Sequence, residues 1–345
     1  MKIIQDLNLE ELQEVMARLG EQKFRAKQVL DNVNLGKKIS DFSNISKDLK
    51  AKLLAEFEDI PLRIHTVQES KDGTKKFAYE LWDGNIIEGV LMSYKYGNTL
   101  CVSTQVGCRM GCKFCASTLN GLARNLTAGE ILSQVLVVNN LLGGKTGKNR
   151  EITNIVLMGS GEPLDNYDNV VKFLHLVSSP EGLNVSPRNI SLSTCGIVPN
   201  IYKLADENLQ VILTISLHAP NDDLRRTIMP IANKYSVSEI VKSAKHYFEK
   251  TGRRVVFEYA LIDGVNNTPE CAEELANLVK GFPTHINLIP LNEVKERDLK
   301  TVTHKKAEYF KDLLEKRRVS VTIRRTIADD IDGACGQLRN KIIDK

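Results

Sequence analysis

The chain has 345 residues, 42% of them hydrophobic and 26% charged, and a formal net charge of +4. This length suits one large domain and a smaller one, and a charge this small neither requires nor excludes a polyanionic partner. The N-terminal residues MKIIQDLNLEEL reach acidic positions before a signal peptide could form, and no later run approaches the roughly 20 apolar residues of a membrane span. We therefore expect a cytoplasmic protein with no membrane segment.

Residues 1–60 are predicted to form short amphipathic helices that end near Pro61, and we assign them to an N-terminal helical accessory domain. Two apolar sets recur there at roughly helical spacing: Leu7, Leu9, Leu12, Val15, Met16 and Leu19 in the first, and Phe24, Val29 and Leu30 in the second.

Residues 61–97 are predicted to form a β linker. Between Arg63 and Met92 short alternating runs surround two Asp-Gly pairs, Asp72-Gly73 and Asp83-Gly84, and Asp-Gly marks tight turns between strands.

In residues 98–345, apolar runs typical of strands alternate with helical patterns. Such repeated units indicate a parallel sheet, and the runs are too few for a regular eight-stranded barrel. We expect an α/β fold with a partial (βα)6 TIM-like barrel and an active site at the carboxyl ends of its strands. The runs are TLCVST, NIVLM, NISLST, VILTISL, RVVFEYAL, HINLIPL and VSVTIR, and the clearest helical segments are residues 127–142, 236–250 and 303–317.

Three of the seven cysteines, Cys108, Cys112 and Cys115, follow directly on the first of these runs. This crowding does not suit a secreted disulfide framework, but it does suit a metal site in a reducing compartment. Gly107 and Gly111 allow a loop to turn three thiolates toward one centre, which fits a cubane [4Fe-4S] cluster with one open iron. A structural zinc site would need a fourth ligand, and no second Cys/His pair with suitable spacing follows.

Polar residues stand where the later runs end, and side chains at strand tips are candidates for binding a cofactor. Without the cysteines, Gly159-Ser-Gly161-Glu162-Pro163 would be a strand-to-helix turn with a surface glutamate, and His218 alone would be a satisfied core histidine. The other candidates at strand ends are Ser193, Ser216, Leu217 and Asn292.

The cysteine triple after a first strand, with an aromatic residue before the last cysteine, resembles the radical S-adenosylmethionine (SAM) superfamily. The resemblance implies that the cluster's open iron chelates the methionine part of SAM. It also implies that Gly161 and Glu162 bind the amino group of SAM, while Ser193, Ser216, Leu217, His218 and Asn292 contact its ribose, carboxylate and adenine.

Two further cysteines extend this resemblance: Cys101 in LCVSTQVGC and Cys335 in DDIDGACGQL. Each alone would be an inert core or tail residue. Together, and along nearly the whole chain, they resemble the RlmN-type dual-specificity RNA methyltransferases and their Cfr-type relatives. The resemblance implies that Cys335 is methylated as an intermediate, that Cys101 forms a transient disulfide with it, and that Glu88 accepts a proton. Taken alone, Glu88 would be an exposed strand residue.

The target explains why this family needs two thiols. Carbon 2 of adenine has no in-plane lone pair and is electron-poor, so it cannot attack a sulfonium methyl as an amine would. A covalent relay through Cys335 divides the transfer into easier steps: methylation of the thiolate, hydrogen abstraction from the S-methyl group, and addition to the ring carbon. Attack by Cys101 on the Cys335 sulfur then releases the methylated base, and an external reductant resets the pair.

The same resemblance implies the partners: 23S ribosomal RNA at the peptidyl transferase centre, the adenosine 3′ to the anticodon in some transfer RNAs, and flavodoxin or ferredoxin as electron donor. We expect a monomer. Most basic clusters are predicted to be solvated, while any at the barrel mouth would bind phosphates of an RNA whose target base leaves its stack. These clusters are Lys75-Lys76, Arg225-Arg226, Arg253-Arg254, Lys316-Arg317-Arg318 and Arg324-Arg325.

Three alternatives remain open. The first keeps the chemistry but moves it to carbon 8, as in Cfr-type enzymes, although HINLIPLN and Gly159-Ser-Gly-Glu-Pro look closer to the carbon-2 group. The second is a non-catalytic iron-sulfur or zinc RNA-binding module, which gives Cys101 and Cys335 no use. The third is a radical enzyme acting on a peptide or metabolite, which leaves the tail unexplained. Cys195 and Cys271 are predicted to be structural, with Cys195 near the cofactor and Cys271 on a helix.

Overall fold

The computed structural model describes residues 2–59, 61–294, 296–325, 327–328, 330–331 and 336–343. The chain forms two compact units. The first comprises Met1–Val106, Arg124–Gly159 and Asn166–Ile190, and the second comprises Gly107–Ala123, Ser160–Asp165 and Ser191–Lys345. None of the described helices is both long and apolar enough to cross a membrane.

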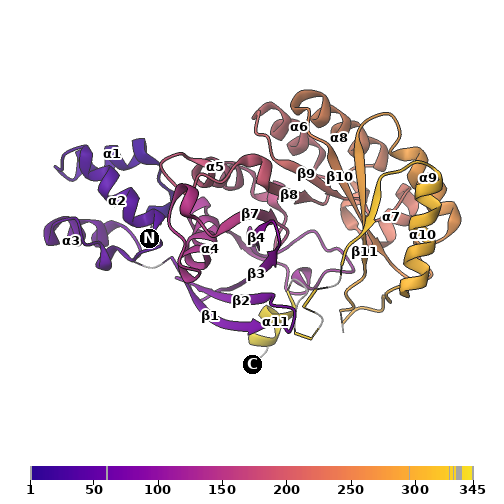
Figure 1. The fold of residues 1–345 in the computed structure, drawn as a ribbon, viewed down its shortest axis with the longest axis horizontal. Coiled ribbons are helices and arrows are strands. Elements are labelled where there is room, and N and C mark those ends of the chain that lie inside the picture. The colour runs from indigo at the N-terminus through magenta and orange to yellow at the C-terminus, as the bar shows by residue number, and fades with distance from the viewer. Residues whose placement is uncertain are drawn as a thin grey trace. The chain divides into compact units, whose positions relative to one another are not determined.

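The first unit begins with a group of helices (Figure 1). Two of them start at side-chain caps, which supply acceptors for N–H groups that have no partner within the helix. Asn8 accepts from the Glu11 N–H while the Glu11 carboxylate accepts from the Asn8 N–H, and Ser46 accepts from the Leu49 N–H. The elements are η1 (Ile4–Asp6), α1 (Leu9–Arg18), α2 (Phe24–Asn34), η2 (Ile39–Asp41) and α3 (Lys47–Glu56).

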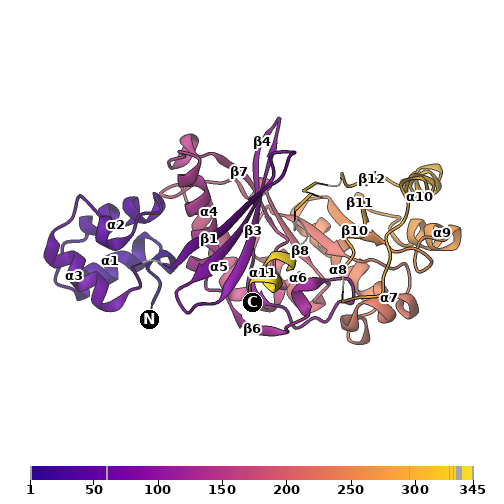
Figure 2. The ribbon, with the colours of Figure 1, turned by 90° about the horizontal axis from the view of Figure 1, so that it is seen from below.

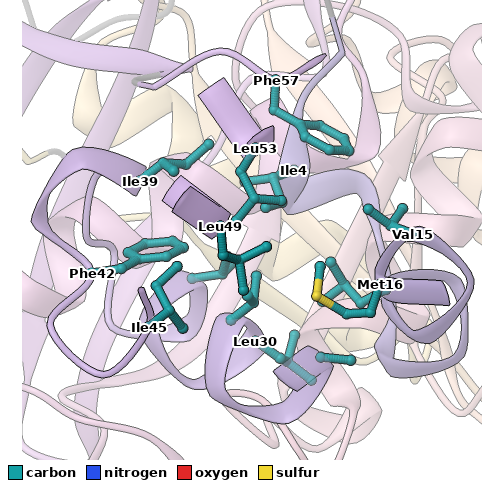
Figure 3. Close-up of a cluster of buried hydrophobic side chains, with 14 residues drawn as sticks. Ile4, Val15, Met16, Leu30, Ile39, Phe42, Ile45, Leu49, Leu53 and Phe57 are labelled. Atoms are coloured by element: carbon teal, nitrogen blue, oxygen red, sulfur yellow. The ribbon is translucent and has the colours of Figure 1, made fainter. Parts of the chain in front are cut away.

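These helices bury an apolar core of their own (Figure 3). The two predicted apolar sets are confirmed except at Phe24, which is 54% exposed. Phe24 is the first residue of α2, and the Arg25 guanidinium lies 4.9 Å from the centre of its ring. The buried side chains are those of Ile4, Leu12, Val15, Met16, Ala26, Val29, Leu30, Val33, Ile39, Phe42, Ile45, Leu49, Leu53 and Phe57.

The alternating runs predicted between residues 63 and 92 are strands in the structure. Gly73 and Gly84 have φ of +84° and +80°, the left-handed conformation that glycine adopts without steric cost and that an Asp-Gly turn requires. The strand order in this unit is β1-β2-β3-β4-β7, antiparallel from β1 to β4 and parallel from β4 to β7. The strands are β1 (Leu62–Glu69), β2 (Lys75–Leu81), β3 (Ile86–Tyr94), β4 (Gly97–Cys101) and β7 (Ile152–Leu157).

The N-terminal helices pack on α4 (Ala128–Leu141) and α5 (Tyr167–Ser178), as Figure 2 shows. The Gly129 N–H donates to the Asp6 carboxylate over 2.5 Å, and Lys172 forms an ion pair with Glu11 over 2.6 Å. A Cβ atom at Gly129 would lie 2.6 Å from the Asp6 nitrogen. The absence of a side chain at Gly129 therefore allows this close approach. Short 3-10 turns at η4 (Gly147–Asn149) and η6 (Pro187–Asn189) complete the unit.

The second unit carries parallel strands in the order β8-β9-β10-β11-β12, each pair parallel. All seven predicted strand runs are strands in the structure, and helices connect them, so the predicted α/β arrangement is confirmed. The strands are β8 (Ile190–Thr194), β9 (Ile212–Ser216), β10 (Val255–Leu261), β11 (Thr284–Pro290) and β12 (Val321–Ile323). The helices are α6 (Val198–Asp206), α7 (Asp222–Ile228), α8 (Val237–Thr251), α9 (Pro269–Leu278), α10 (His304–Lys316) and α11 (Gln337–Ile343).

The first prediction concerns the docking of the N-terminal segment on α4. Alanine is about 1 kcal/mol better than glycine inside a helix, yet Gly129→Ala is expected to lower the free energy of unfolding by about 1 to 3 kcal/mol, because the new methyl overlaps the Asp6 backbone. Chemical denaturation of the two proteins measures this difference. Unchanged or higher stability of the variant would contradict the close approach of Asp6 to α4.

Candidate iron-sulfur and cofactor site

The cysteine triple lies in the second unit, on the loop between β5 (Gln105–Gly107) and η3 (Ala116–Thr118). The Cys108 N–H donates to the Gly121 carbonyl over 2.9 Å. Gly107 has φ of +79°, and a Cβ atom there would overlap the same carbonyl, so only glycine fits without displacing the loop. The other end of the loop is held by the Lys113 N–H, which donates to the Ile228 carbonyl at the end of α7 over 2.9 Å. The triple is therefore placed by backbone contacts.

The three thiols lie in a largely apolar setting. Cys108 and Cys112 are buried and Cys115 is half-buried. Burial raises the pKa of Cys108 to about 12 and raises that of Cys112 further, and the neighbouring Cys115 adds to both shifts. Bare thiolates are thus unfavourable here, whereas a bound cation would stabilise them. All six described cysteines are free thiols.

The loop fits an iron-sulfur cluster better than a single ion. Among the described residues, no three His, Cys, Asp or Glu side chains could hold one metal ion. In a cubane each thiolate binds a different iron, so the three sulfurs need not meet at one point. Cys112 and Cys195 share an apolar cluster with Ala219, Met229 and Ile262, and such shielding favours a cluster kept from solvent. Cys108, Cys112 and Cys115 would hold the cluster and leave its fourth iron open.

Glu162 is buried rather than on the surface, with 4% of its area exposed. One carboxylate oxygen accepts from the Leu164 N–H over 2.9 Å and the other accepts from the Cys195 N–H over 2.7 Å. Burial raises the pKa of this carboxyl, although the backbone hydrogen bonds oppose the shift. Gly161 before it has φ of +109°, which turns the chain into the buried position. The segment after β7 is thereby joined to the end of β8.

Two of the predicted cofactor residues converge on a carboxylate that the sequence did not point to. The hydroxyls of Ser193 on β8 and Ser216 on β9 donate to the same oxygen of Glu258 over 3.2 Å and 3.4 Å. Glu258 is buried on β10, where burial raises its pKa. The three side chains form a polar group inside the apolar sheet, which could bind hydroxyl groups of a ligand.

His218 is buried directly after β9 with φ of +57°, a conformation uncommon for a residue with a side chain. Its Nδ1 accepts from the Ala260 N–H over 2.8 Å, which places the proton of the neutral ring on Nε2. Burial, with the nearby Arg225, lowers its pKa to about 3, so the ring is neutral at physiological pH. Phe114 of the cysteine loop meets it edge to face, with ring centres 4.7 Å apart.

Arg225 was predicted as part of a solvated or phosphate-binding pair, and that prediction is wrong. Its side chain is fully buried. The guanidinium donates to the carbonyls of Cys195 (2.6 Å), Leu217 (3.0 Å) and Ser216 (3.1 Å), and its Nη1 atom is buried without a hydrogen-bond partner. A buried cation with an unused donor beside the cysteine loop suits an anionic group there. Asn292, in contrast, is exposed after β11.

Cys101 and Glu88 belong to the first unit. Val90 pairs with both Cys101 and Lys76 in antiparallel register, which places these residues on one face of the sheet, together with Glu88 two positions along β3. Cys101 is 6% exposed and Glu88 only 3%, so the reading of Glu88 as an exposed strand residue is wrong. Its carboxylate lies 3.3 Å from the fully buried Lys76 ammonium. The sequence did not indicate this ion pair, since Lys76 was predicted to face solvent or phosphate.

Cys335 lies outside the described residues. Gly336, which follows it, has φ of +85°, and a Cβ there would lie 2.6 Å from the Ser117 nitrogen. Asn340 donates to the Ala116 carbonyl over 3.2 Å. The segment after Cys335 thus packs on the turn that follows Cys115. Cys271 lies on α9 as predicted.

Comparison with known proteins agrees with this arrangement. Residues 102–279 match the Radical SAM superfamily, and residues 4–58 match the domain described as the Ribosomal RNA large subunit methyltransferase N-terminal domain. A crystal structure of a radical SAM methyltransferase from Sphaerobacter thermophilus is 40% identical, with a TM-score of 0.92 over 98% of this chain and 99% of that one. The fold and the cysteine loop therefore define a radical SAM enzyme, which confirms the predicted fold class and its [4Fe-4S] and SAM cofactors.

Curated relatives match along the full chain. A protein of Clostridium perfringens (strain 13 / Type A), described as "Probable dual-specificity RNA methyltransferase RlmN", is 56% identical over 99% of this chain and 98% of its own length. A protein of Lachnoclostridium phytofermentans with the same description is 51% identical over 99% of this chain and 95% of its own length. The chain belongs to the RlmN family of radical SAM methyltransferases.

The second prediction tests the buried ion pair. Lys76→Met is expected to lower the free energy of unfolding by about 3 to 5 kcal/mol, because it leaves the Glu88 carboxylate buried without its cation. Lys75→Met is the matched control, since Lys75 is partly exposed and its ion pair with Glu69 contributes about 1 kcal/mol at most. Denaturant unfolding compares the two, and equal effects would refute the burial of Lys76.

The third prediction tests the buried guanidinium in the same way. Arg225→Gln is expected to lower the free energy of unfolding by about 3 kcal/mol or more, because three buried carbonyl oxygens lose a charged donor. Arg226→Gln is its control, because Arg226 is half exposed and forms an ion pair with the exposed Asp223. The melting temperatures of the two variants should differ by several degrees. A variant at position 225 as stable as the control would contradict the assignment.

Proposed function

We propose that this chain methylates carbon 2 of adenosine in 23S ribosomal RNA at the peptidyl transferase centre, and of the adenosine 3′ to the anticodon in some transfer RNAs. The full-length similarity to relatives described as dual-specificity RNA methyltransferases carries this proposal. The presence of both Cys101 and Cys335 supports it, because a radical enzyme of another kind has no need of these two thiols.

The arrangement around the cysteine loop supports the cofactor assignment. Cys108, Cys112 and Cys115 hold the cluster, and Gly161 and Glu162 face the amino group of SAM. Ser193, Ser216, Leu217, His218 and Asn292 take its remaining polar groups. When bound, the cluster and SAM supply a methyl group and an organic radical. The neutral His218 ring offers an Nε2 donor, and the serine hydroxyls beside Glu258 suit a ligand that carries hydroxyl groups.

The chain's own residues carry the methyl group to the RNA. The Cys335 thiolate would attack the methyl carbon of the sulfonium, the bond from that carbon to the sulfonium sulfur would break, the demethylated cofactor would leave, and Cys335 would become a methyl thioether. This methyl group would lose one hydrogen atom to the organic radical that SAM supplies, and the methylene carbon left on Cys335 bonds to the adenine ring. One electron would then pass to the oxidised cluster while Glu88 accepts the ring proton, which restores aromaticity. The Cys101 thiolate attacks the Cys335 sulfur, and the bond from that sulfur to the methylene carbon breaks with its electron pair going to the carbon, which takes up a proton and becomes the new methyl group. An external two-electron donor reduces the disulfide that forms.

Glu88 needs to be a carboxylate to accept that proton. The fully buried Lys76 ammonium lies 3.3 Å from the Glu88 carboxylate and forms an ion pair with it. The ion pair thus supports the role of Glu88, and it explains why a lysine is buried on the same sheet face as Cys101.

The chain is divided into three regions with different roles in this reaction. Residues 1–60 form an accessory RNA-binding domain, residues 61–97 a β linker, and residues 98–345 the radical SAM methyltransferase domain. The match of residues 4–58 to an RNA-methyltransferase N-terminal domain and the separate apolar core of these helices support the first boundary. The protein acts in the cytoplasm as a monomer, with flavodoxin or ferredoxin as the external electron donor.

The fourth prediction tests the relay. Mass spectrometry of the anaerobically purified, cluster-loaded protein should find a methyl group on Cys335, and Cys101→Ala should accumulate a covalent adduct between Cys335 and RNA. The variant lacks the thiol that breaks the final carbon–sulfur bond, so the intermediate persists. Cys271→Ala is the control, because Cys271 lies on α9, has no role in the relay and should trap no RNA. An unmodified Cys335 without adduct in turnover-competent protein would refute the mechanism.

A further inference from the structure

The single tryptophan of the chain is exposed in a position that the chemistry above does not use. Trp82 lies in the turn between β2 and β3, and 45% of its surface is exposed. Large exposed aromatic side chains are frequently contact residues for another molecule, since water solvates their faces poorly. The surroundings of this ring show which kind of molecule it suits.

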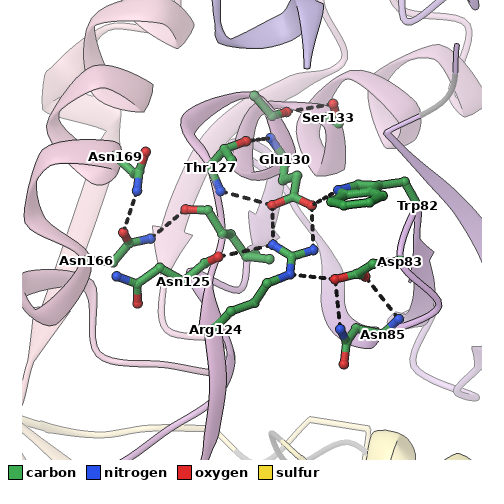
Figure 4. Close-up of polar contacts among 12 residues, drawn as sticks. Trp82, Asp83, Asn85, Arg124, Asn125, Thr127, Glu130, Ser133, Asn166 and Asn169 are labelled. Atoms are coloured by element: carbon green, nitrogen blue, oxygen red, sulfur yellow. Dashed lines mark hydrogen bonds and ion pairs between the residues drawn. The ribbon is translucent and has the colours of Figure 1, made fainter. Parts of the chain in front are cut away.

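The orientation of Trp82 is fixed by a buried polar network (Figure 4). Its indole N–H donates to the Glu130 carboxylate over 3.1 Å, and Glu130 is fully buried in the first turn of α4. The Arg124 guanidinium donates to both Glu130 oxygens over 2.8 Å and to Asp83 over 2.6 Å. Its central carbon lies 5.8 Å from the centre of the indole ring. The ring is thus held in place before any partner arrives.

The network favours a flat, uncharged partner over a phosphate. Arg124 is the only cation of this group, and its Nε, Nη1 and Nη2 atoms already donate to carboxylates. Hydrogen bonds from Arg124 and Asn85 outweigh burial and lower the pKa of Asp83, so this carboxylate remains charged and would repel a phosphate. The most exposed side chain among Trp82, Asp83, Arg124 and Glu130 is the indole. Any nucleobase can stack on such an aromatic ring, because every base has a flat π face, so this contact depends little on the RNA sequence.

The strand register places this turn at the end of the sheet where the chemistry is expected. Val90 of β3 pairs with Cys101 at the carboxyl end of β4, and β3 runs antiparallel to β4. Ile86 at the start of β3, and the turn at Trp82 before it, therefore extend beyond Cys101 in the direction in which β4 points. At roughly 3.3 Å per residue, Ile86 lies about 13 Å past the pairing of Val90 with Cys101.

We infer that Trp82, with Arg124 beside it, is a stacking platform for an unpaired nucleobase of the RNA substrate, next to the adenosine that is methylated. This inference rests on the proposed function. The enzyme must move the target adenosine out of the base stack of the RNA. A neighbouring base that is displaced with the adenosine loses its stacking partner, and an aromatic ring can replace that partner. Trp82 would then contribute to RNA binding without touching the reacting atoms.

Because Trp82 is the only tryptophan, its fluorescence reports on this contact directly. The cluster-loaded protein is titrated anaerobically with a short RNA hairpin that carries an unpaired adenosine in its loop. N-acetyltryptophanamide in the same solutions corrects for absorption by RNA and cluster. We expect saturable quenching, because a base stacked on an indole quenches its emission. Saturated binding by filter retention without any quenching would overturn the inference, and this result requires no variant.

Variants give the second test. Trp82→Ala is expected to weaken RNA binding roughly 5- to 100-fold, whereas Trp82→Phe keeps a stacking ring and should stay within about threefold of wild type. Tyr96→Ala is the matched control. Tyr96 is 71% exposed but lies in the β3–β4 turn, at the opposite end of β3. Equal losses in Trp82→Phe and Trp82→Ala, or an equal loss in Tyr96→Ala, would overturn the inference. If wild-type protein neither binds nor methylates RNA, the proposed function itself fails.

Discussion

The second unit depends on one buried guanidinium. Arg225 of α7 donates to the carbonyls of Cys195, Ser216 and Leu217, which lie at the ends of β8 and β9. The last residue of the same helix, Ile228, accepts from the Lys113 N–H in the cysteine loop. A single short helix thereby joins the loop that carries the thiols to the strand ends that carry the cofactor candidates. A charged donor is needed, because carbonyls at strand ends have no partner in the sheet and cannot be left unsatisfied when buried.

Both units bury charge where chemistry is proposed. Glu162 and Glu258 are held by backbone N–H groups or serine hydroxyls in the second unit, and Glu88 is held by Lys76 in the first. Burial of this kind is costly, and apolar residues of similar volume are frequently neutral or stabilising in its place. Fold stability therefore does not explain why these carboxylates are buried. Their partners fix the position of each group, which is what cofactor binding and proton transfer require.

The sequence predicted the strands well because β-branched runs and Asp-Gly turns are local signals. The cysteine triple was equally local, and Gly107 and Gly111 within it marked a tight loop. Lys76 and Arg225 were predicted wrongly because a basic residue is assigned to solvent unless a partner is known, and their partners come from other strands and helices. Glu258 was missed for the same reason: inside RVVFEYAL nothing marks it as the acceptor for two serines on neighbouring strands. Burial of a charge is thus a tertiary property.

Glu130 shows how one such residue can serve local and tertiary structure together. It completes the capping box of α4, since one carboxylate oxygen accepts from the Thr127 N–H over 3.0 Å. The same oxygen also accepts from Arg124, and the other accepts from Arg124 and from the Trp82 indole. A carboxylate has about four acceptor positions, and all are used, so full burial leaves none unsatisfied. The local requirement of a helix start therefore fixes the orientation of an exposed aromatic ring in a turn distant in sequence.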